Sequence, residues 1–169
     1  LYPNEADMKW SKLLTNLLAN ASSAILDWTP YQIFSHPASC QVEILQIKEA
    51  VKVMGHYHYR VINLPSTPLK LLINIICYFP FKLSQFVLMR FVGKGRGDKM
   101  PSLHIDLSQG KKDSEVDFLN GAVVHFGQKA GIPTPVNDFL NKTLLGIVRG
   151  ELERDFYRND PLKLLNSII

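Results

Sequence analysis

Apolar residues in this chain recur at spacings of three and four, and almost nowhere do they alternate with polar residues. The first spacing gathers side chains on one face of an α-helix, whereas alternation is typical of a half-buried strand. The series Val136, Leu140, Leu144 and Ile147 is a clear instance. The pattern predicts an all-α fold of roughly six or seven helices.

Residues that begin and end helices divide the chain into segments. Proline favours the first helical position, and glycine favours the position just after the last. Pro80 also interrupts the most apolar stretch, which predicts two short helices joined there. We therefore expect helices over residues 8–26, 37–54, 68–92 (in two parts), 101–110, 114–131 and 134–147.

Composition indicates one compact domain rather than a nucleic-acid-binding or disordered chain. The chain has 169 residues, of which 46% are hydrophobic and 20% are charged, with a net charge of +4. Its lysines and arginines are scattered, and the only dense cluster is Lys94, Arg96 and Lys99. Nucleic-acid binding would call for a basic stripe with interleaved aromatic residues. We expect no nucleic-acid partner.

Cysteine and histidine usage gives no sign of a metal site or a disulfide framework. Cys40 and Cys77 lie far apart in apolar stretches, outside any CxxC pair, which indicates buried free thiols in a reducing compartment. His56 and His58 lack a third ligand at a standard spacing. With no signal-peptide pattern at Leu1, the expected location is cytoplasmic.

The segment from Pro68 to Val92 is apolar enough to require a membrane test. Its longest uncharged run, Leu71 to Phe81, has 11 residues and includes Pro80. A spanning helix needs about 20 predominantly apolar residues, so no membrane span is expected. Core helices or a dimer face are favoured. Attachment to a membrane surface stays open, because basic and aromatic residues mix here.

One face of the first predicted helix has an unusual polar composition. Lys12, Asn16 and Asn20 follow at intervals of four, opposite an apolar stripe that begins at Trp10. Lys12 is the only charged residue between Trp10 and Leu26. A lysine in such surroundings suits proton transfer, and a carboxamide can both donate and accept hydrogen bonds. The face is either plain surface or built to be covered by something polar.

Three segments in order resemble the ketopantoate reductase (2-dehydropantoate 2-reductase) family. Residues 12–20, KLLTNLLAN, are similar to the K-x-x-x-N-x-x-x-N helix that opens its C-terminal domain. Residues 99–137 resemble its S-x-x-x-D segment, then its T/S-E-I/V-D-x-x-N-G and G-x-x-x-P-x-N blocks. The matched segments cover residues 9–26 and 99–140. The resemblance implies an all-α fold like the 6-phosphogluconate dehydrogenase C-terminal domain.

The resemblance also implies roles for individual residues. Lys12 would be the general acid that protonates the alkoxide formed at the C2 carbonyl of ketopantoate. Asn16 and Asn20 would hold the hydroxyl and carbonyl oxygens of the substrate. Ser102 would bind the substrate carboxylate, at the start of a helix where free amides favour an anion.

Two further motif positions would support the site. Glu115 would help position the ribose and nicotinamide side of NADPH, although simple helix-start electrostatics explains an acidic residue there equally well. Asn120 and Gly121 would be mainly structural, allowing two helices to approach closely.

The sequence departs from the family pattern in three places. One extra residue lies between Asp106 and Glu115, which puts the reach of Glu115 in question. A further substrate-contacting asparagine has no match, because that region reads Asp27-Trp-Thr-Pro30. Residues 63–99 are longer and more apolar than in commoner members. The substrate could therefore be another 2-oxo acid.

The dinucleotide-binding domain of the family has no counterpart here. The nearest glycine pattern, Gly93 to Asp98, is not G-x-G-x-x-G and follows no predicted strand. We therefore expect residues 1–169 to be a single helical substrate-binding and dimerisation domain, cut from a two-domain enzyme of pantothenate biosynthesis. Its own N-terminal Rossmann domain would bind most of the NADPH, a homodimer is possible, and this fragment alone would be inactive. The alternative is a non-catalytic helical module for dimerisation or peripheral membrane attachment.

Overall fold

The computed structural model describes residues 4–65, 67–93, 99–111 and 113–169. Within them every regular element is helical, and an isolated bridge between Leu64 and Thr67 is the only strand-like pairing. The predicted all-α class is therefore confirmed. The elements are α1 (Glu5–Leu17), α2 (Ala21–Leu26), α3 (Pro30–Ser35), α4 (Pro37–His56), α5 (Leu69–Tyr78), α6 (Phe81–Val87), the π-helical η1 (Leu88–Gly93), α7 (Ser102–Ser108), α8 (Val116–Ala130), α9 (Pro135–Arg149) and α10 (Pro161–Asn166).

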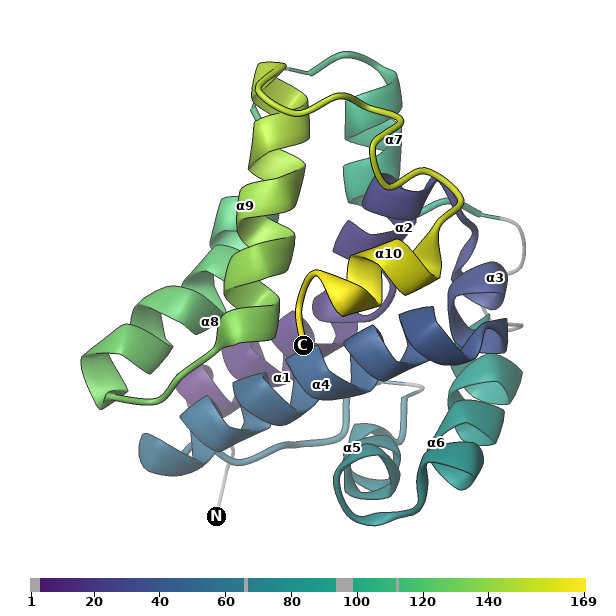
Figure 1. The fold of residues 1–169 in the computed structure, drawn as a ribbon. Helices are drawn as coiled ribbons and strands as arrows, with labels where there is room; N and C mark the ends of the chain where they lie inside the picture. Colours follow the sequence, from purple (N-terminus) through teal and green to yellow (C-terminus); the bar gives the residue numbers. More distant parts are fainter. Residues whose placement is uncertain (1–3, 66, 94–98, 112) are drawn as a thin grey trace.

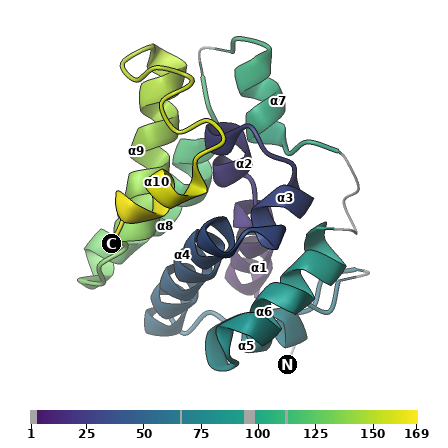
Figure 2. The ribbon, with the colours of Figure 1, turned by 45° about the vertical axis from the view of Figure 1, so that its right-hand side comes forward.

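The longest helix, α4, lies at the centre of the molecule. It packs against α1, α5, α8, α9 and α10, which places it between the α8–α9 pair and the α5–α6 pair (Figures 1 and 2). Ile47, Ala50 and Val53 are fully buried along it. Because its neighbours cover it on several sides, α4 can also bring polar side chains into the interior, where they must find hydrogen-bond partners.

The prediction of one continuous helix over residues 8–26 is wrong. These residues form two helices, α1 and α2, and the chain turns between them. Ala19 adopts a left-handed conformation, with φ of 53°, between the two helices. Its backbone N–H donates to the buried carboxylate of Glu43 on α4 at 2.6 Å. Tertiary contacts thus stabilise a turn that the local sequence, rich in leucine and alanine, would not form.

Two short helices were missed by the sequence pattern. At α3, Thr29 and Gln32 form a reciprocal capping box and Pro30 occupies the first turn. At α10, Asp160 accepts a hydrogen bond from the backbone of Lys163, again with proline in the first turn. Their start signals are present in the sequence, but both helices have only six residues.

The apolar segment folds into two helices, as its proline predicts. α5 ends at Tyr78 and α6 begins at Phe81, with Pro80 at the junction. None of the helices in the described part of the chain is long and apolar enough to cross a membrane.

Candidate functional site

Lys12 and Asn16 lie one turn apart on the exposed face of α1. The opposite face holds Trp10 and Leu14 in the core, where the Trp10 ring meets the edge of Phe126 on α8 at 5.2 Å between centroids. The apolar stripe therefore fixes α1, and the lysine and asparagine point away from the core. A ligand or another domain that covers Lys12 must therefore approach from the solvent side of α1.

Asn20 lies in a different setting, buried where the chain turns from α1 into α2. Its Oδ1 accepts a hydrogen bond from the backbone N–H of Leu103 at 3.1 Å, and its Nδ2 donates to the Ser102 hydroxyl at 3.4 Å. The structure thus brings together two predicted site residues that are 82 positions apart. The carboxamide of Asn20 is engaged within the protein, where we had expected it to hold substrate oxygens.

Ser102 is the first residue of α7, and its side chain is exposed. Because its oxygen accepts a hydrogen bond from Asn20, its own O–H can be donated to another acceptor. This arrangement suits a ligand oxygen beside α7. It also makes Asn20 a positioning residue for Ser102 and for the first turn of the helix.

Glu115 stands at the N-cap position of α8 with its side chain exposed. α8 packs against α1, the helix that carries Lys12 and Asn16. The Trp10–Phe126 contact between the two helices lies toward the other end of α8 from Glu115. Among the predicted site residues, the structure shows direct contact between Asn20 and Ser102.

A buried polar network on α4, missed by sequence reasoning, supports this arrangement. Glu43 accepts hydrogen bonds from the Ala19 backbone, the Ser22 hydroxyl and Gln46 Nε2. Gln46 also donates to the carbonyl oxygen of Leu17, at the end of α1. A buried carboxylate that accepts several hydrogen bonds can hold a chain in an otherwise unfavourable turn.

The same network reaches the two asparagines of the C-terminal motif blocks. Asn120 Nδ2 donates to Gln46 Oε1 at 2.9 Å and to Asn137 Oδ1 at 3.0 Å. Asn137 Nδ2 in turn donates to the Gln46 carbonyl and to Glu49. The polar residues 43, 46 and 49 recur every three positions along α4, and this spacing was the only signal for the network in the sequence.

Glu49 uses its carboxylate to cap a neighbouring helix. It accepts from the backbone N–H groups of Val136 and Asn137, in the first turn of α9, at 2.9 and 3.0 Å. Burial raises the pKa of Glu49, and the hydrogen bonds from Asn137 and Val136 oppose that rise. The cap satisfies amides that a helix leaves without intrahelical partners.

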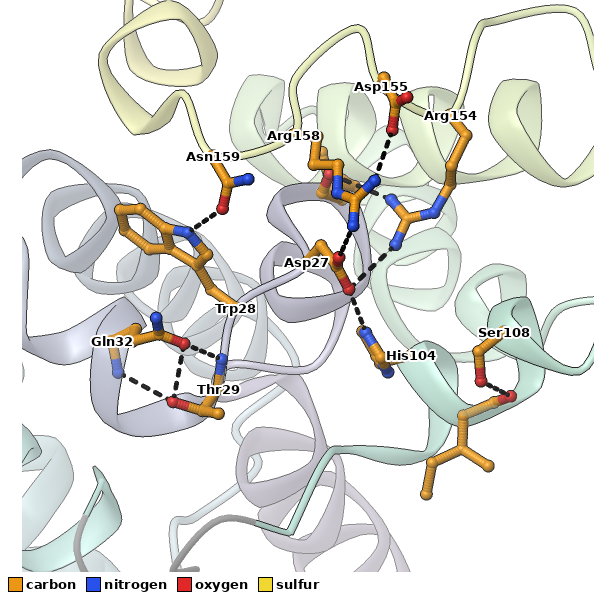
Figure 3. Close-up of polar contacts among 12 residues, drawn as sticks. Asp27, Trp28, Thr29, Gln32, His104, Ser108, Arg154, Asp155, Arg158 and Asn159 are labelled. Carbon is orange, nitrogen blue, oxygen red and sulfur yellow. Dashed lines mark hydrogen bonds and ion pairs between the residues drawn. The ribbon is translucent and has the colours of Figure 1, made fainter.

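A cluster of charged side chains surrounds Asp27, in the region where the family pattern has a substrate-contacting asparagine (Figure 3). Asp27, in a left-handed conformation at the end of α2, lies 2.6 Å from His104 Nε2 and 2.9 Å from Arg158 Nη2, with Arg154 Nη2 at 3.6 Å. The hydrogen bond with His104, and then the two arginines, hold the pKa of Asp27 below its usual value. His104 is on α7, two positions after Ser102, so this pair also fixes α7 to α2.

Both cysteines are free thiols; Cys40 is buried, as predicted, whereas Cys77 is only half-buried. Burial raises the pKa of Cys40 to about 12, and it also raises that of Cys77. Neither is therefore a ready nucleophile at neutral pH.

No group of three His, Cys, Asp or Glu residues in the described ranges could hold a metal ion. Of the glycine-containing loop, residues 94–98 fall outside the described residues.

Solved structures share this fold. A PanE/ApbA family ketopantoate reductase from Ralstonia eutropha JMP134 superposes with a TM-score of 0.69 at 24% identity, over 89% of this chain and 43% of that one. A D-mandelate dehydrogenase in complex with NADH and anilino(oxo)acetate gives a TM-score of 0.63 at 20% identity, over 83% of this chain and 67% of that one. These similarities establish the fold.

Sequence comparison establishes the family. The model for the ketopantoate reductase PanE/ApbA C-terminal domain matches residues 4–147, so the chain belongs to this family. It is 29% identical to a 2-dehydropantoate 2-reductase of Streptococcus pyogenes over 126 residues, and 28% identical to one of Archaeoglobus fulgidus over 141 residues. These matches cover 75% and 83% of this chain, but only 35% and 39% of the relatives. The chain thus spans less than half the length of these relatives.

Proposed function

We propose that this chain is the substrate-binding domain of an NADPH-dependent 2-oxo acid reductase, and specifically of a 2-dehydropantoate 2-reductase that converts ketopantoate to pantoate. The observation that carries the proposal is the contact of Asn20 with Ser102 and Leu103. It joins the K-x-x-x-N-x-x-x-N segment to the serine segment, beside the helix that presents Lys12. Membership of the family supports the same reaction.

Within this proposal each residue has a defined task. Lys12 donates a proton from Nζ to the C2 oxygen of the substrate as negative charge develops there. Asn16 donates to a substrate oxygen from the same face of α1, and Ser102 donates to the carboxylate. Asn20 positions Ser102 and the first turn of α7 through its two hydrogen bonds.

NADPH, when bound, supplies the hydride, and most of its binding surface belongs to a Rossmann domain upstream of this one. In this chain Glu115 fits a part in that site, because its exposed carboxylate can accept a hydrogen bond from a hydroxyl or amide group. The remaining partners, including a second copy of the protein, belong to the complete enzyme.

A reductase for another 2-oxo acid is the second candidate. It is favoured by Asp27, which stands where the resemblance expects an asparagine and is bound to His104 and Arg158. A carboxylate held in this way cannot replace the donor group of a carboxamide.

The test uses the complete protein and follows NADPH oxidation with ketopantoate. Replacing Lys12 with alanine should lower kcat/KM by roughly 100-fold or more, the usual scale of general acid catalysis. Lys9→Ala is the matched control, because Lys9 is exposed on the same helix and pairs with Glu5. Equal activity of both variants would remove Lys12 from the mechanism.

Turnover of a different 2-oxo acid instead of ketopantoate would change the proposed substrate but keep the proposed type of reaction. Residues 1–169 alone should not oxidise NADPH.

A further inference from the structure

Exposed apolar side chains gather on one part of this molecule, the helices α5, α6 and η1. Of the thirteen large hydrophobic side chains that are exposed in the described residues, seven lie between positions 71 and 91. Tyr78 is 80% exposed and Phe91 is 70% exposed. We call this set the hairpin face; it consists of Leu71, Tyr78, Phe79, Phe81, Leu83, Phe86 and Phe91. Such a concentration of exposed apolar side chains is typical of a surface that binds a protein, a membrane or a ligand.

Charge is strongly segregated in the same part of the chain. The sequence has 15 acidic residues, yet none occurs from Ala50 to Gly97, an interval that contains seven lysines and arginines. Three of these cations, Lys70, Lys82 and Arg90, are exposed among the residues of the hairpin face. In the described part of the structure none of the three forms an ion pair with a carboxylate.

Helix geometry places these cations and apolar side chains together. On α5 the exposed positions are 70, 71, 74 and 78, which fall on one side of the helix. Lys82, Phe86 and Arg90 follow at intervals of four along α6 and into η1, and all three are exposed. Both views show α5 and α6 side by side at one end of the molecule, away from α8 and α9 (Figures 1 and 2). Each of these helices therefore presents basic and apolar side chains to solvent on the same side.

An apolar hollow opens between α5 on one side and the end of α6 with η1 on the other. Its volume is about 270 Å³, and Leu71, Leu72, Ile75, Val87 and Phe91 are among its lining residues. Among the described residues that line it, Thr67 is the only polar one. The hollow therefore suits an apolar group such as part of an acyl chain.

We propose that the hairpin face binds the surface of an anionic phospholipid bilayer. Phenylalanine and leucine side chains would enter the boundary between headgroups and acyl chains, and Lys70, Lys82 and Arg90 would lie at the anionic headgroups. The described helices are too short or too polar to cross the bilayer, so the protein lies on it. This attachment does not depend on the reaction proposed for the Lys12 face.

Charge is the reason to favour a membrane over a second copy of the chain. A two-fold symmetric dimer pairs a patch with itself. Through this face it would bring two copies of Lys70, Lys82 and Arg90 into one interface, with no acidic residue nearby in the sequence to neutralise them. An anionic bilayer supplies the missing negative charge over the whole surface.

Sedimentation of the complete protein with vesicles tests the proposal. We expect binding to phosphatidylcholine vesicles that contain phosphatidylglycerol, weak binding to pure phosphatidylcholine, and loss of binding in high salt. Changing Lys70, Lys82 and Arg90 to glutamine should lower the partition coefficient roughly a hundredfold, about fivefold for each charge. Phe86→Ser with Phe91→Ser should lower it at least about tenfold, because less apolar surface is buried.

The controls are matched in residue type and exposure. Lys129→Gln and Phe118→Ser on α8 remove an exposed lysine and an 80% exposed phenylalanine outside the hairpin face, and they should leave binding unchanged. All the substituted side chains are exposed, so helicity and unfolding temperature should stay close to wild type.

Three results would overturn the proposal. The first is equal binding to both vesicle types, or binding that the hairpin variants do not change. The second is absence of binding by the complete protein while residues 1–169 do bind, which would mean that an upstream domain covers the face. The third is no vesicle binding together with a dimer that Phe86→Ser and Phe91→Ser dissociate, which would assign the face to a second copy.

Discussion

Asn20 donates a side-chain hydrogen bond to the Ser102 hydroxyl at 3.4 Å and so connects the end of the α1–α2 turn to the start of α7. The oxygen of the same carboxamide accepts the backbone N–H of Leu103. One side chain thereby fixes both the serine and the helix that carries it. The position of Ser102 relative to the Lys12 face depends on this residue.

Substitutions at Asn20 and Ser102 should therefore have different effects. Ser102→Ala removes an exposed hydroxyl, so the free energy of unfolding should change by less than about 0.5 kcal/mol, whereas KM should rise roughly tenfold. Asn20→Ala leaves the buried amide of Leu103 without its acceptor, so it should raise KM and also cost about 1–3 kcal/mol of stability. Urea unfolding of this chain and steady-state kinetics of the complete protein measure the two effects. Unchanged KM in both variants would refute the role given to Ser102.

The turn that positions Asn20 depends on Glu43. Because the fully buried carboxylate accepts from the Ala19 amide, the Ser22 hydroxyl and Gln46, Glu43→Ala should destabilise the chain by about 3–5 kcal/mol. Gln41→Ala, at an exposed position on the same helix, is the control and should change stability by less than about 0.5 kcal/mol. Equal unfolding midpoints in urea for the two variants would show that the turn does not need Glu43.

The Asp27 cluster should give the chain a defined pH dependence. His104 and the two arginines lower the pKa of Asp27, so the ionised carboxyl stabilises the folded state. This stabilisation is complete above the unfolded pKa of about 3.9 and disappears as the pH falls through the lower folded value. Asp27→Asn should therefore be less stable than wild type at neutral pH, and the difference should shrink in acid below about pH 3.9.

Thermal unfolding across that pH range measures the effect. Glu151→Gln, which removes an exposed carboxylate outside the cluster, should follow the wild-type curve at every pH. A difference between Asp27→Asn and wild type that stays constant into acid would mean that the ion pairs contribute nothing.

The sequence predicts the helices better than it predicts their junctions. Spacing and capping residues locate α4, α8 and α9 to within a few residues, because an amphipathic helix records its buried face in its own sequence. The break at Ala19 could not be predicted, since Glu43 stabilises it from 24 positions away. For the same reason the pattern placed Asn20 in line with Lys12 and Asn16, although it lies buried against α7.

The two glycines Gly127 and Gly55 should respond in opposite ways to alanine, since helix propensity alone favours alanine at both by about 1 kcal/mol. On α8, a Cβ at Gly127 would lie 2.9 Å from the carbonyl oxygen of Ile132 and 2.8 Å from Thr134 Cγ2. The backbone oxygen belongs to the tight turn into α9 and cannot move without disturbing it, so overpacking prevails and Gly127→Ala should cost about 1–3 kcal/mol. On α4, a Cβ at Gly55 meets nothing within 4 Å, so Gly55→Ala should stabilise the chain by about 0.5–1 kcal/mol. Urea unfolding of both variants decides the matter, and stabilisation by Gly127→Ala would show that α8 and the turn are packed less closely than the structure indicates.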